Sequence, residues 1–260
     1  MARPPDRRDM LPVLLSIPHG GTQVPPELSE SVCLSARDQF DDSDPLTREI
    51  YDIGSEAAHV VKAEIARPYV DLNRAPDDRP PANADGVIKT STCYGRHIYK
   101  PGFEPTAESI ELLLRRYYWP YHAALRHAVA CGDVAIGFDC HSMAASAPPI
   151  APDPGQERPA FCLSNRDGAT CPANLLEALT RAISRAFEIS ESDVALNIPF
   201  KGGYITRAHG TGPVPWVQIE INRSFYLDPR WFDSATLRVD PRRLADLRQR
   251  FHSVLSHIDL

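Results

Sequence analysis

Several absences narrow the class of protein to which this chain belongs. Its six cysteines form no C-x-x-C pair and follow no regular spacing, a pattern that fits reduced thiols in a cytoplasmic protein. Its longest hydrophobic runs are too short to span a membrane, so we predict no membrane contact. The sequence also shows no internal repeat and no low-complexity linker.

An excess of positive charge is lacking as well. Lysine and arginine total 28 against 34 aspartate and glutamate residues, a formal net charge of −6. This balance argues against binding nucleic acid by general electrostatic attraction. A local basic pocket for a small acidic substrate is still compatible with it.

The rest of the composition is that of an ordinary globular protein. With 260 residues, of which 43% are hydrophobic and 24% charged, the chain is long enough for one domain with a proper core. We predict a basic N-terminal extension over residues 1–11 and a single domain over residues 12–260. The first hydrophobic run lacks a small-residue cleavage site, so we interpret it as a core strand and not as a signal peptide.

Strand-like and helix-like segments alternate along the chain. Strands are predicted at 13–17, 59–65, 69–72, 134–138, 160–163, 194–197 and 216–222. Helices are predicted at 45–57 with Asp44 as N-cap, at 106–131 with a bend at Pro120, at 171–188 and at 241–258. Residues 75–105 are predicted as a long loop, and residues 144–158 as a flexible loop that is able to act as a lid. The alternation predicts an α/β fold with a mixed, mostly parallel sheet and helices on both faces, whose ligands bind at the carboxyl ends of the strands.

Two histidines follow predicted strands. His141 comes two residues after Asp139, on the same face, and a metal-bound histidine usually donates its second ring N–H to a carboxylate. His19 follows the first strand and precedes two glycines, which allow a ligand to approach the backbone closely. The pair indicates one metal site at one edge of the sheet. The alternatives are a turn histidine at 19 and a buried histidine–aspartate pair that only stabilises the core.

A catalytic zinc site commonly has three protein ligands and a position for water, so a third ligand is needed. Residues 39–44 (QFDDSD) offer several carboxylates ahead of the predicted helix. Plain helix capping is the alternative interpretation of this cluster. Both roles are compatible if Asp42 caps the helix and Asp44 binds the metal.

Cationic side chains suggest how an acidic substrate is bound. Arg74 follows Asn73 near a predicted strand end, where a guanidinium can grip a planar carboxylate and an amide can add a donor. Lys201 and Arg207 flank a glycine pair that resembles an anion-binding loop. A surface salt bridge for Arg74 and a flexible surface hairpin for the loop are the alternatives.

A candidate general base lies on the last predicted strand. Gln218 and Glu220 alternate with hydrophobic residues and therefore share one face. A lone strand glutamate is usually exposed to solvent. In a central strand beside a metal it would suit the deprotonation of water.

In their order along the chain, these motifs resemble the N-formylglutamate amidohydrolase family, which is similar in turn to the zinc carboxypeptidases and aspartoacylases. The resemblance covers about residues 12 to 227 and rests on SIPHGG at 16–21, DSD at 42–44, DLNR at 71–74, DCHS at 139–142, KGGYITR at 201–207 and QIEI at 218–221. One departure concerns the second metal ligand, because the His-x-x-Glu motif of the carboxypeptidases is replaced here by His19-Gly-Gly-Thr22. Asp44 is therefore our choice for that ligand.

The resemblance implies a carboxypeptidase-like fold and a metal-dependent amidohydrolase domain over residues 12–260. It implies zinc, with another divalent metal as an alternative, and hydrolysis of N-formyl-L-glutamate to formate and the amino acid. His19 and His141 would bind the metal, Glu220 would be the base, and Asn73 with Arg74 would hold a substrate carboxylate. The rival functions are a deacylase or small peptidase acting on another small N-acyl substrate, and a non-catalytic binder of acidic metabolites. The sequence does not indicate an oligomeric state.

Overall fold

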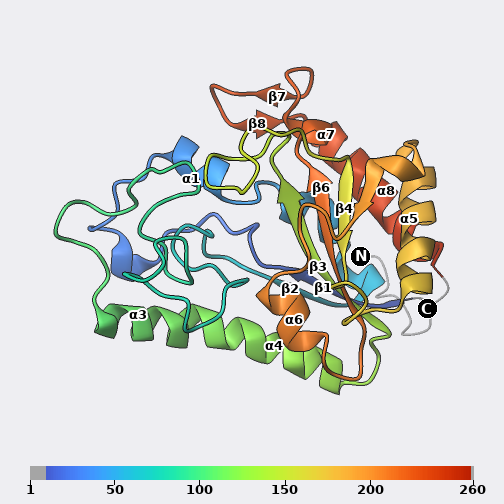
Figure 1. The fold of residues 1–260 in the computed structure, drawn as a ribbon, viewed down its shortest axis with the longest axis horizontal. Helices are drawn as coiled ribbons and strands as arrows, with labels where there is room; N and C mark the ends of the chain where they lie inside the picture. Colours follow the sequence, from blue (N-terminus) through green and yellow to red (C-terminus); the bar gives the residue numbers. More distant parts are fainter. Residues whose placement is uncertain (1–9, 259–260) are drawn as a thin grey trace, which may run out of the picture.

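A computed structural model describes residues 10–258, so the predicted N-terminal extension falls largely outside the described residues. A six-stranded sheet with the order β2-β1-β3-β6-β4-β5 forms the centre of the molecule, and β7 and β8 form a small hairpin (Figure 1). The strands are β1 Leu11–Ile17, β2 Ala57–Lys62, β3 Ile136–Met143, β4 Phe161–Ser164, β5 Val194–Leu196, β6 Trp216–Asn222, β7 Phe232–Asp233 and β8 Arg238–Val239. The α-helices are α1 Ala36–Asp42, α2 Thr47–Tyr51, α3 Ala107–Leu113, α4 Trp119–Ala130, α5 Ala173–Phe187, α6 Tyr204–His209, α7 Ser224–Leu227 and α8 Pro241–Ser256.

The sheet is mixed and mostly parallel, as predicted. β2, β1, β3 and β6 run in the same direction, and only β4, with its parallel neighbour β5, runs antiparallel to β6. The carboxyl ends of β1, β3 and β6 therefore meet at one edge of the sheet, where both predicted histidines and the predicted glutamate belong.

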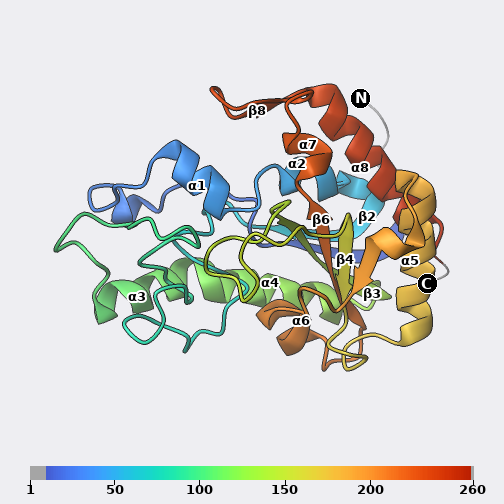
Figure 2. The ribbon, with the colours of Figure 1, turned by 45° about the horizontal axis from the view of Figure 1, so that its top comes forward.

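Two hydrophobic cores lie on opposite faces of this sheet. Because side chains alternate along a strand, Val13, Leu15 and Ile17 of β1 face one core, whereas Leu14 faces the other. The first core is covered by α2, α5 and α8, and the second by α3, α4 and the long loop that precedes them (Figures 1 and 2). The predicted single layer of sheet between helices is confirmed. Within residues 10–258, no helix combines the length and the hydrophobicity needed to cross a membrane.

Two elements predicted between residues 45 and 72 differ from the observed structure. The helix expected at 45–57 is reduced to the five residues of α2, because Leu46 takes a left-handed backbone conformation with φ of 65° and breaks the helical path. Asp44 is not its side-chain cap, and Asp42 belongs to α1 instead. The prediction of a strand at 69–72 is wrong, since these residues form a turn beyond β2.

The central strand is longer than its sequence pattern predicted. Beyond Phe138, β3 continues to Met143 with every residue buried, because its register with β6 extends to the Met143–Asn222 pair. Asp139 and His141 therefore lie inside the strand and not after its end. In the helical segment 106–131, a π-helical turn over Leu114–Tyr118 separates α3 from α4, and it comes before Pro120.

Candidate active site

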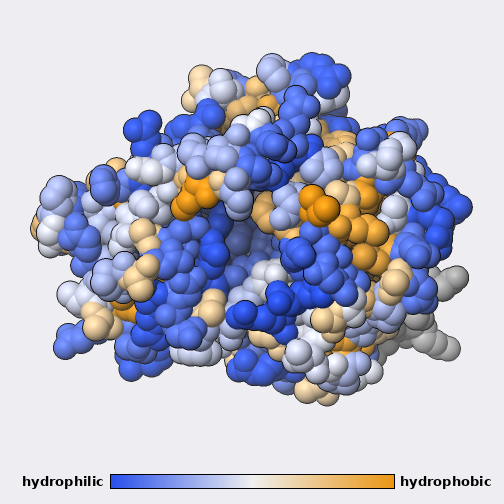
Figure 3. Space-filling view, in the orientation of Figure 1, coloured by the Kyte–Doolittle hydropathy of each residue, from blue (hydrophilic) through white to orange (hydrophobic). Residues whose placement is uncertain are grey.

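A cleft of about 680 Å³ opens at the carboxyl edge of the sheet. Its floor contains residues from β3 and β6, and its walls come from the loops at 67–94, 144–158 and 198–203. Figure 3 shows a hollow near the middle of this face, with mainly hydrophilic residues inside it and small hydrophobic patches at its rim. The predicted ligand position at this edge therefore coincides with a real cavity.

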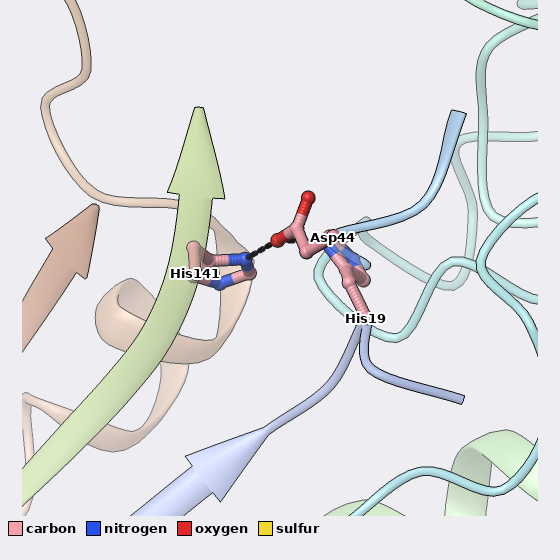
Figure 4. A group of neighbouring side chains, drawn as sticks. All are labelled: His19, Asp44 and His141. Carbon is pink, nitrogen blue, oxygen red and sulfur yellow. Dashed lines mark hydrogen bonds and ion pairs between the residues drawn. The ribbon is translucent and has the colours of Figure 1, made fainter. Parts of the chain in front are cut away.

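Three buried side chains converge at the floor of the cleft: His19, Asp44 and His141 (Figure 4). Oδ2 of Asp44 lies 2.8 Å from Nδ1 of His141 and 3.3 Å from Nδ1 of His19. All three candidate ligand atoms lie within 4.8 Å of one another. Of the two aspartates left open by the sequence, Asp44 is in this group, whereas Asp42 pairs with the fully buried Lys89 at 2.7 Å.

Each histidine is held from behind by a second carboxylate. Nε2 of His141 lies 3.1 Å from Oδ1 of Asp139, the partner that the sequence predicted. Nε2 of His19 lies 2.8 Å from Oδ1 of Asp71, an equivalent partner that we did not predict. These contacts point both Nδ1 atoms towards Asp44, which is the usual way that proteins orient metal-binding imidazoles.

Arg223 holds the third member of the group in place. Its Nη2 lies 3.0 Å from Oδ1 of Asp44, and its Nε donates to Oγ of Ser142 at 3.1 Å. The two carboxylate oxygens are therefore divided, one towards the guanidinium and one towards the histidines. Arg223 follows Asn222 at the end of β6, so the strand that carries Glu220 also fixes Asp44.

The electrostatics of the group favour charged partners despite burial. Burial alone would raise the pKa of the Asp44 carboxyl, but His19 and His141 hold that pKa well below its usual value. Burial would lower the pKa of His141, but Asp139 and Asp44 raise it well above the ordinary range. Without a metal, this arrangement brings protonated imidazole and carboxylate together.

The same geometry fits a divalent metal. Ligands about 2.0 Å from a tetrahedral zinc ion lie about 3.3 Å apart, close to the separations of the Asp44 oxygen from the two histidine nitrogens. Two imidazoles and one carboxylate are also a donor set that zinc accepts, and three ligands leave a position for water. The residues present therefore fit a catalytic zinc site.

Glu220 is buried on β6, next to His141 on β3 in the parallel register. Gln218 lies on the same face, as predicted, and its Nε2 donates to Oε1 of Glu220 at 2.7 Å. Burial raises the pKa of Glu220 to about 7. A carboxylate in this range can both accept and return a proton near neutral pH.

Asn73 contributes an amide to the wall of the cleft. The backbone N–H of Ile205 donates to its Oδ1 at 2.7 Å, which turns Nδ2 towards His141, 3.0 Å from Nε2. When Nε2 of His141 donates to Asp139 it cannot also accept from Asn73, so this amide is available to a ligand. Gly203 is needed beside it, because a Cβ there would lie 2.2 Å from Nδ2 of Asn73.

Arg74 lies at the same wall and is oriented by a buried ion network. Its Nη2 pairs with Oδ2 of Asp85 at 2.6 Å, and the other oxygen of Asp85 lies 2.7 Å from Nζ of Lys89. Lys89 in turn pairs with Asp42. The network fixes one edge of the Arg74 guanidinium, and its side chain remains 37% exposed towards a ligand.

Of the other two predicted cations, Lys201 and Arg207, one lines the cleft and the other does not. Lys201 lines the cleft, but its side chain is 66% exposed and pairs with Asp167 at 3.0 Å. Arg207 lies over the ring of Tyr204 on α6 and is not among the residues that line the cleft. The glycines after His19 approach other parts of the chain and not a ligand, since a Cβ on Gly21 would lie 2.2 Å from the backbone oxygen of Ile65.

Sequence reasoning missed Asp71, Arg67 and Arg223. Arg67 donates to Oδ2 of Asp71 at 2.9 Å, four residues away, and thus shares the carboxylate that holds His19. Asp71 belongs to the DLNR motif, of which only the asparagine and the arginine were predicted as site residues. Arg223 directly follows the last residue of β6, and its position at a strand end is the feature of the sequence that indicates a site residue.

A pair of histidines lies behind the cleft wall, between α4 and α6. Nδ1 of His122 lies 3.0 Å from Nε2 of His209, and Nε2 of His122 lies 3.0 Å from the backbone oxygen of Leu72, next to Asn73. Burial, together with the neighbouring His209, lowers the pKa of His122 to about 4. The pair therefore fixes the turn that carries Asn73 with neutral imidazoles.

Known proteins are similar to this chain in sequence and in fold. The family described as N-formylglutamate amidohydrolase matches residues 11–227. An N-formylglutamate deformylase from Pseudomonas aeruginosa is 31% identical in an alignment of 231 residues that covers 85% of this chain and 84% of that protein. A protein of the same name from Pseudomonas putida is 30% identical in an alignment of 227 residues that covers 84% of this chain and 82% of that protein.

Two solved structures have a similar fold. An N-formylglutamate amidohydrolase from Ralstonia eutropha JMP134 aligns with a TM-score of 0.75 and 23% identity over 96% of this chain and 94% of that one. A gene product from Agrobacterium tumefaciens aligns with a TM-score of 0.62 and 16% identity over 96% and 92% of the two chains. The match over most of the sequence, with two relatives of at least 30% identity, confirms the resemblance seen in the motifs: the chain belongs to the N-formylglutamate amidohydrolase family.

Proposed function

We propose that the protein is a zinc-dependent hydrolase that cleaves N-formyl-L-glutamate to formate and L-glutamate. The observation that carries the proposal is the buried group of His19, Asp44 and His141 beside Glu220, at the floor of a cleft, in a member of this family. The Pseudomonas relatives are named for deformylation of this substrate.

His19, Asp44 and His141 would hold the metal. When bound, zinc polarises a carbonyl group and lowers the pKa of a water molecule towards neutrality. Asp71 and Asp139 would keep the two imidazoles in the tautomer whose Nδ1 is free to ligate. Another divalent metal with the same preference for nitrogen and oxygen ligands is the alternative.

Glu220 would move the proton. It takes a proton from the attacking water and returns it to the leaving amine nitrogen, and a pKa of about 7 suits both directions. Gln218 fixes one carboxylate oxygen of Glu220, which leaves the other oxygen for this transfer.

Arg74 and Asn73 would bind the α-carboxylate of the substrate. Arg74 is oriented through Asp85, and Asn73 through Ile205, so both reach the ligand without first having to be ordered. For the second carboxylate, the predicted anion-binding loop offers Lys201 and Arg207. Of these two, Lys201 is the one that lines the cleft.

The decisive experiment measures formate release together with metal content. We expect purified protein to contain about one zinc per chain, to lose activity on chelation, and to prefer N-formyl-L-glutamate over N-acetyl-L-glutamate and dipeptides. Glu220→Gln should retain zinc and lose turnover by roughly two to four orders of magnitude, the usual contribution of general acid–base catalysis.

Glu177→Gln, at an exposed position on α5, is the matched control and should behave like the parent. Preference for a different N-acyl amino acid or for a peptide would move the assignment to another substrate of the same fold. Ligand binding without any turnover would favour the non-catalytic alternative.

A further inference from the structure

The cleft holds a further arginine, Arg158, whose partner is a carboxylate of a neighbouring loop. The side chain of Arg158 is only 6% exposed, although it lines the cleft, and its two terminal nitrogens pair with the two oxygens of Asp153 at 2.8 Å each. Its guanidinium also lies over the ring of Phe200, 5.7 Å from the centroid. This planar, bidentate contact is the one by which arginine recognises a free carboxylate.

The backbone of Arg158 lies beside the carboxyl end of β6, the strand that carries Glu220. The backbone oxygen of Arg158 accepts from Nδ2 of Asn222 at 3.1 Å, and its N–H donates to the oxygen of Ala145 at 2.9 Å. Asn222 is two residues beyond Glu220 on the same face, about 7 Å further along the strand. The distal carboxylate of N-formylglutamate is five bonds from the formyl carbon, a reach of about 6 Å at ordinary bond lengths.

The partner of Arg158 is easier to displace than those of the other cleft arginines. The side chains of the carboxylates that pair with Arg67, Arg74 and Arg223 are at most 12% exposed. Asp153 lies instead in the loop between β3 and β4, and its side chain is 33% exposed. A partly exposed carboxylate regains hydration when it leaves the pair, so a carboxylate from a ligand can take its place.

We propose that Arg158 selects the substrate by binding its distal carboxylate, and that Asp153 pairs with the guanidinium until the substrate carboxylate displaces it. This inference rests on the proposed function and assigns the second carboxylate to Arg158 in place of Lys201. Lys201 is 66% exposed and its contact with Asp167 is open to solvent, where an ion pair discriminates weakly.

The test compares N-formyl-L-glutamate with N-formyl-L-glutamine, which has the same shape and lacks the distal charge. Dissociation constants are measured by calorimetry on the zinc-loaded protein carrying Glu220→Gln, so that neither ligand is consumed. Adding Arg158→Gln should weaken binding of the glutamate ligand roughly ten- to a hundredfold and change the glutamine ligand little. Adding Asp153→Asn should lower the dissociation constant of N-formyl-L-glutamate severalfold, because the competing carboxylate is gone. The dissociation constant of N-formyl-L-glutamine should not change.

Lys201→Gln tests the rival assignment and should weaken binding of both ligands only slightly. A selective loss in Lys201→Gln, or an equal loss of both ligands in Arg158→Gln, would overturn the proposal. If Arg158→Gln fails to fold, the test rests on Asp153→Asn. Unchanged affinity of this variant for N-formyl-L-glutamate would refute competition between Asp153 and the substrate for Arg158. The proposed function is tested separately by formate release from the parent protein: selective binding with no formate would refute that function and leave the assignment of Arg158 intact.

Discussion

Removing the carboxylates behind the two histidines should weaken zinc binding without removing a ligand. Asp139→Asn keeps the size of the side chain. Its remaining oxygen can face His141 and Ser16, and its amide nitrogen can donate to the hydroxyl of Thr206, which accepts as well as donates. What is lost is the charge 3.1 Å from Nε2 of His141. Loss of such an outer partner typically costs ten- to a hundredfold in metal affinity, or about 1.4–2.7 kcal/mol.

Asp71→Asn should cost at least as much zinc affinity and some stability as well. Asp71 lies 2.8 Å from His19, and its second oxygen accepts from Arg67 at 2.9 Å, so the substitution also removes the counter-charge of that arginine. Burial would raise the pKa of the Asp71 carboxyl, but the charges of His19 and Arg67 hold it well below its usual value. The carboxylate is therefore fully charged at neutral pH, and its loss affects both partners.

Zinc affinity is measured by competition with a chromogenic chelator, and folding is followed separately by thermal unfolding with and without metal. Asp133→Asn is the matched control, because Asp133 lies 2.8 Å from His59 in a half-exposed pair that is not in the cleft. This variant should bind zinc like the parent. Parental affinity in both Asp71→Asn and Asp139→Asn would refute the reasoning, since the histidines would then not bind metal through the nitrogens that face Asp44.

Three further substitutions test the surroundings of the site. Asp85→Asn should raise the KM for N-formyl-L-glutamate about tenfold with little change in kcat, because Arg74 loses the partner that orients it; an unchanged KM in a formate assay would contradict this. Gly203→Ala should lower activity strongly in a protein that still folds, because the added Cβ meets Asn73, and parental rates would show that this amide is not needed. His122 has a folded-state pKa of about 4 against an ordinary 6.5, so the unfolded chain takes up its proton first and stability is lost as the pH falls from about 6.5 to 4, by about 3 kcal/mol. Denaturant unfolding of His122→Gln across this range should show a shallower loss than the parent, and an equal slope would exclude this histidine as the cause.

The parts of the site that the sequence predicted lie on or next to strands. His19, His141 and Glu220 follow or interrupt hydrophobic runs with a period of two, and parallel strands bring their carboxyl ends together, so their meeting could be deduced without coordinates. The extent of β3 could not be deduced, because Asp139, His141 and Ser142 are polar and the register with β6 keeps them in the strand.

Several parts that the sequence did not predict lie in the long segment before α3. Asp85 and Lys89 are separated from the site motifs by a Pro- and Gly-rich stretch without periodicity, so no pattern indicated that Lys89 is fully buried or that Asp85 reaches Arg74. Arg158 was not predicted for the same reason, because it lies in a segment without periodicity that we predicted as a flexible loop. Loop paths are fixed by contacts between distant residues, which a local pattern does not contain.

The antiparallel direction of β4 has a consequence for how this fold can diversify. Because β4 runs opposite to β6, the chain leaves β3 at Met143 and re-enters the sheet at Phe161 on the same edge, with no crossover to the other side. A segment that departs and returns at one edge can change in length and sequence while every strand keeps its register. The segment that contains Arg158 and Asp153 can therefore vary between descendants independently of the residues on β1, β3 and β6, so that a lineage can acquire a new substrate while it inherits its chemistry unchanged.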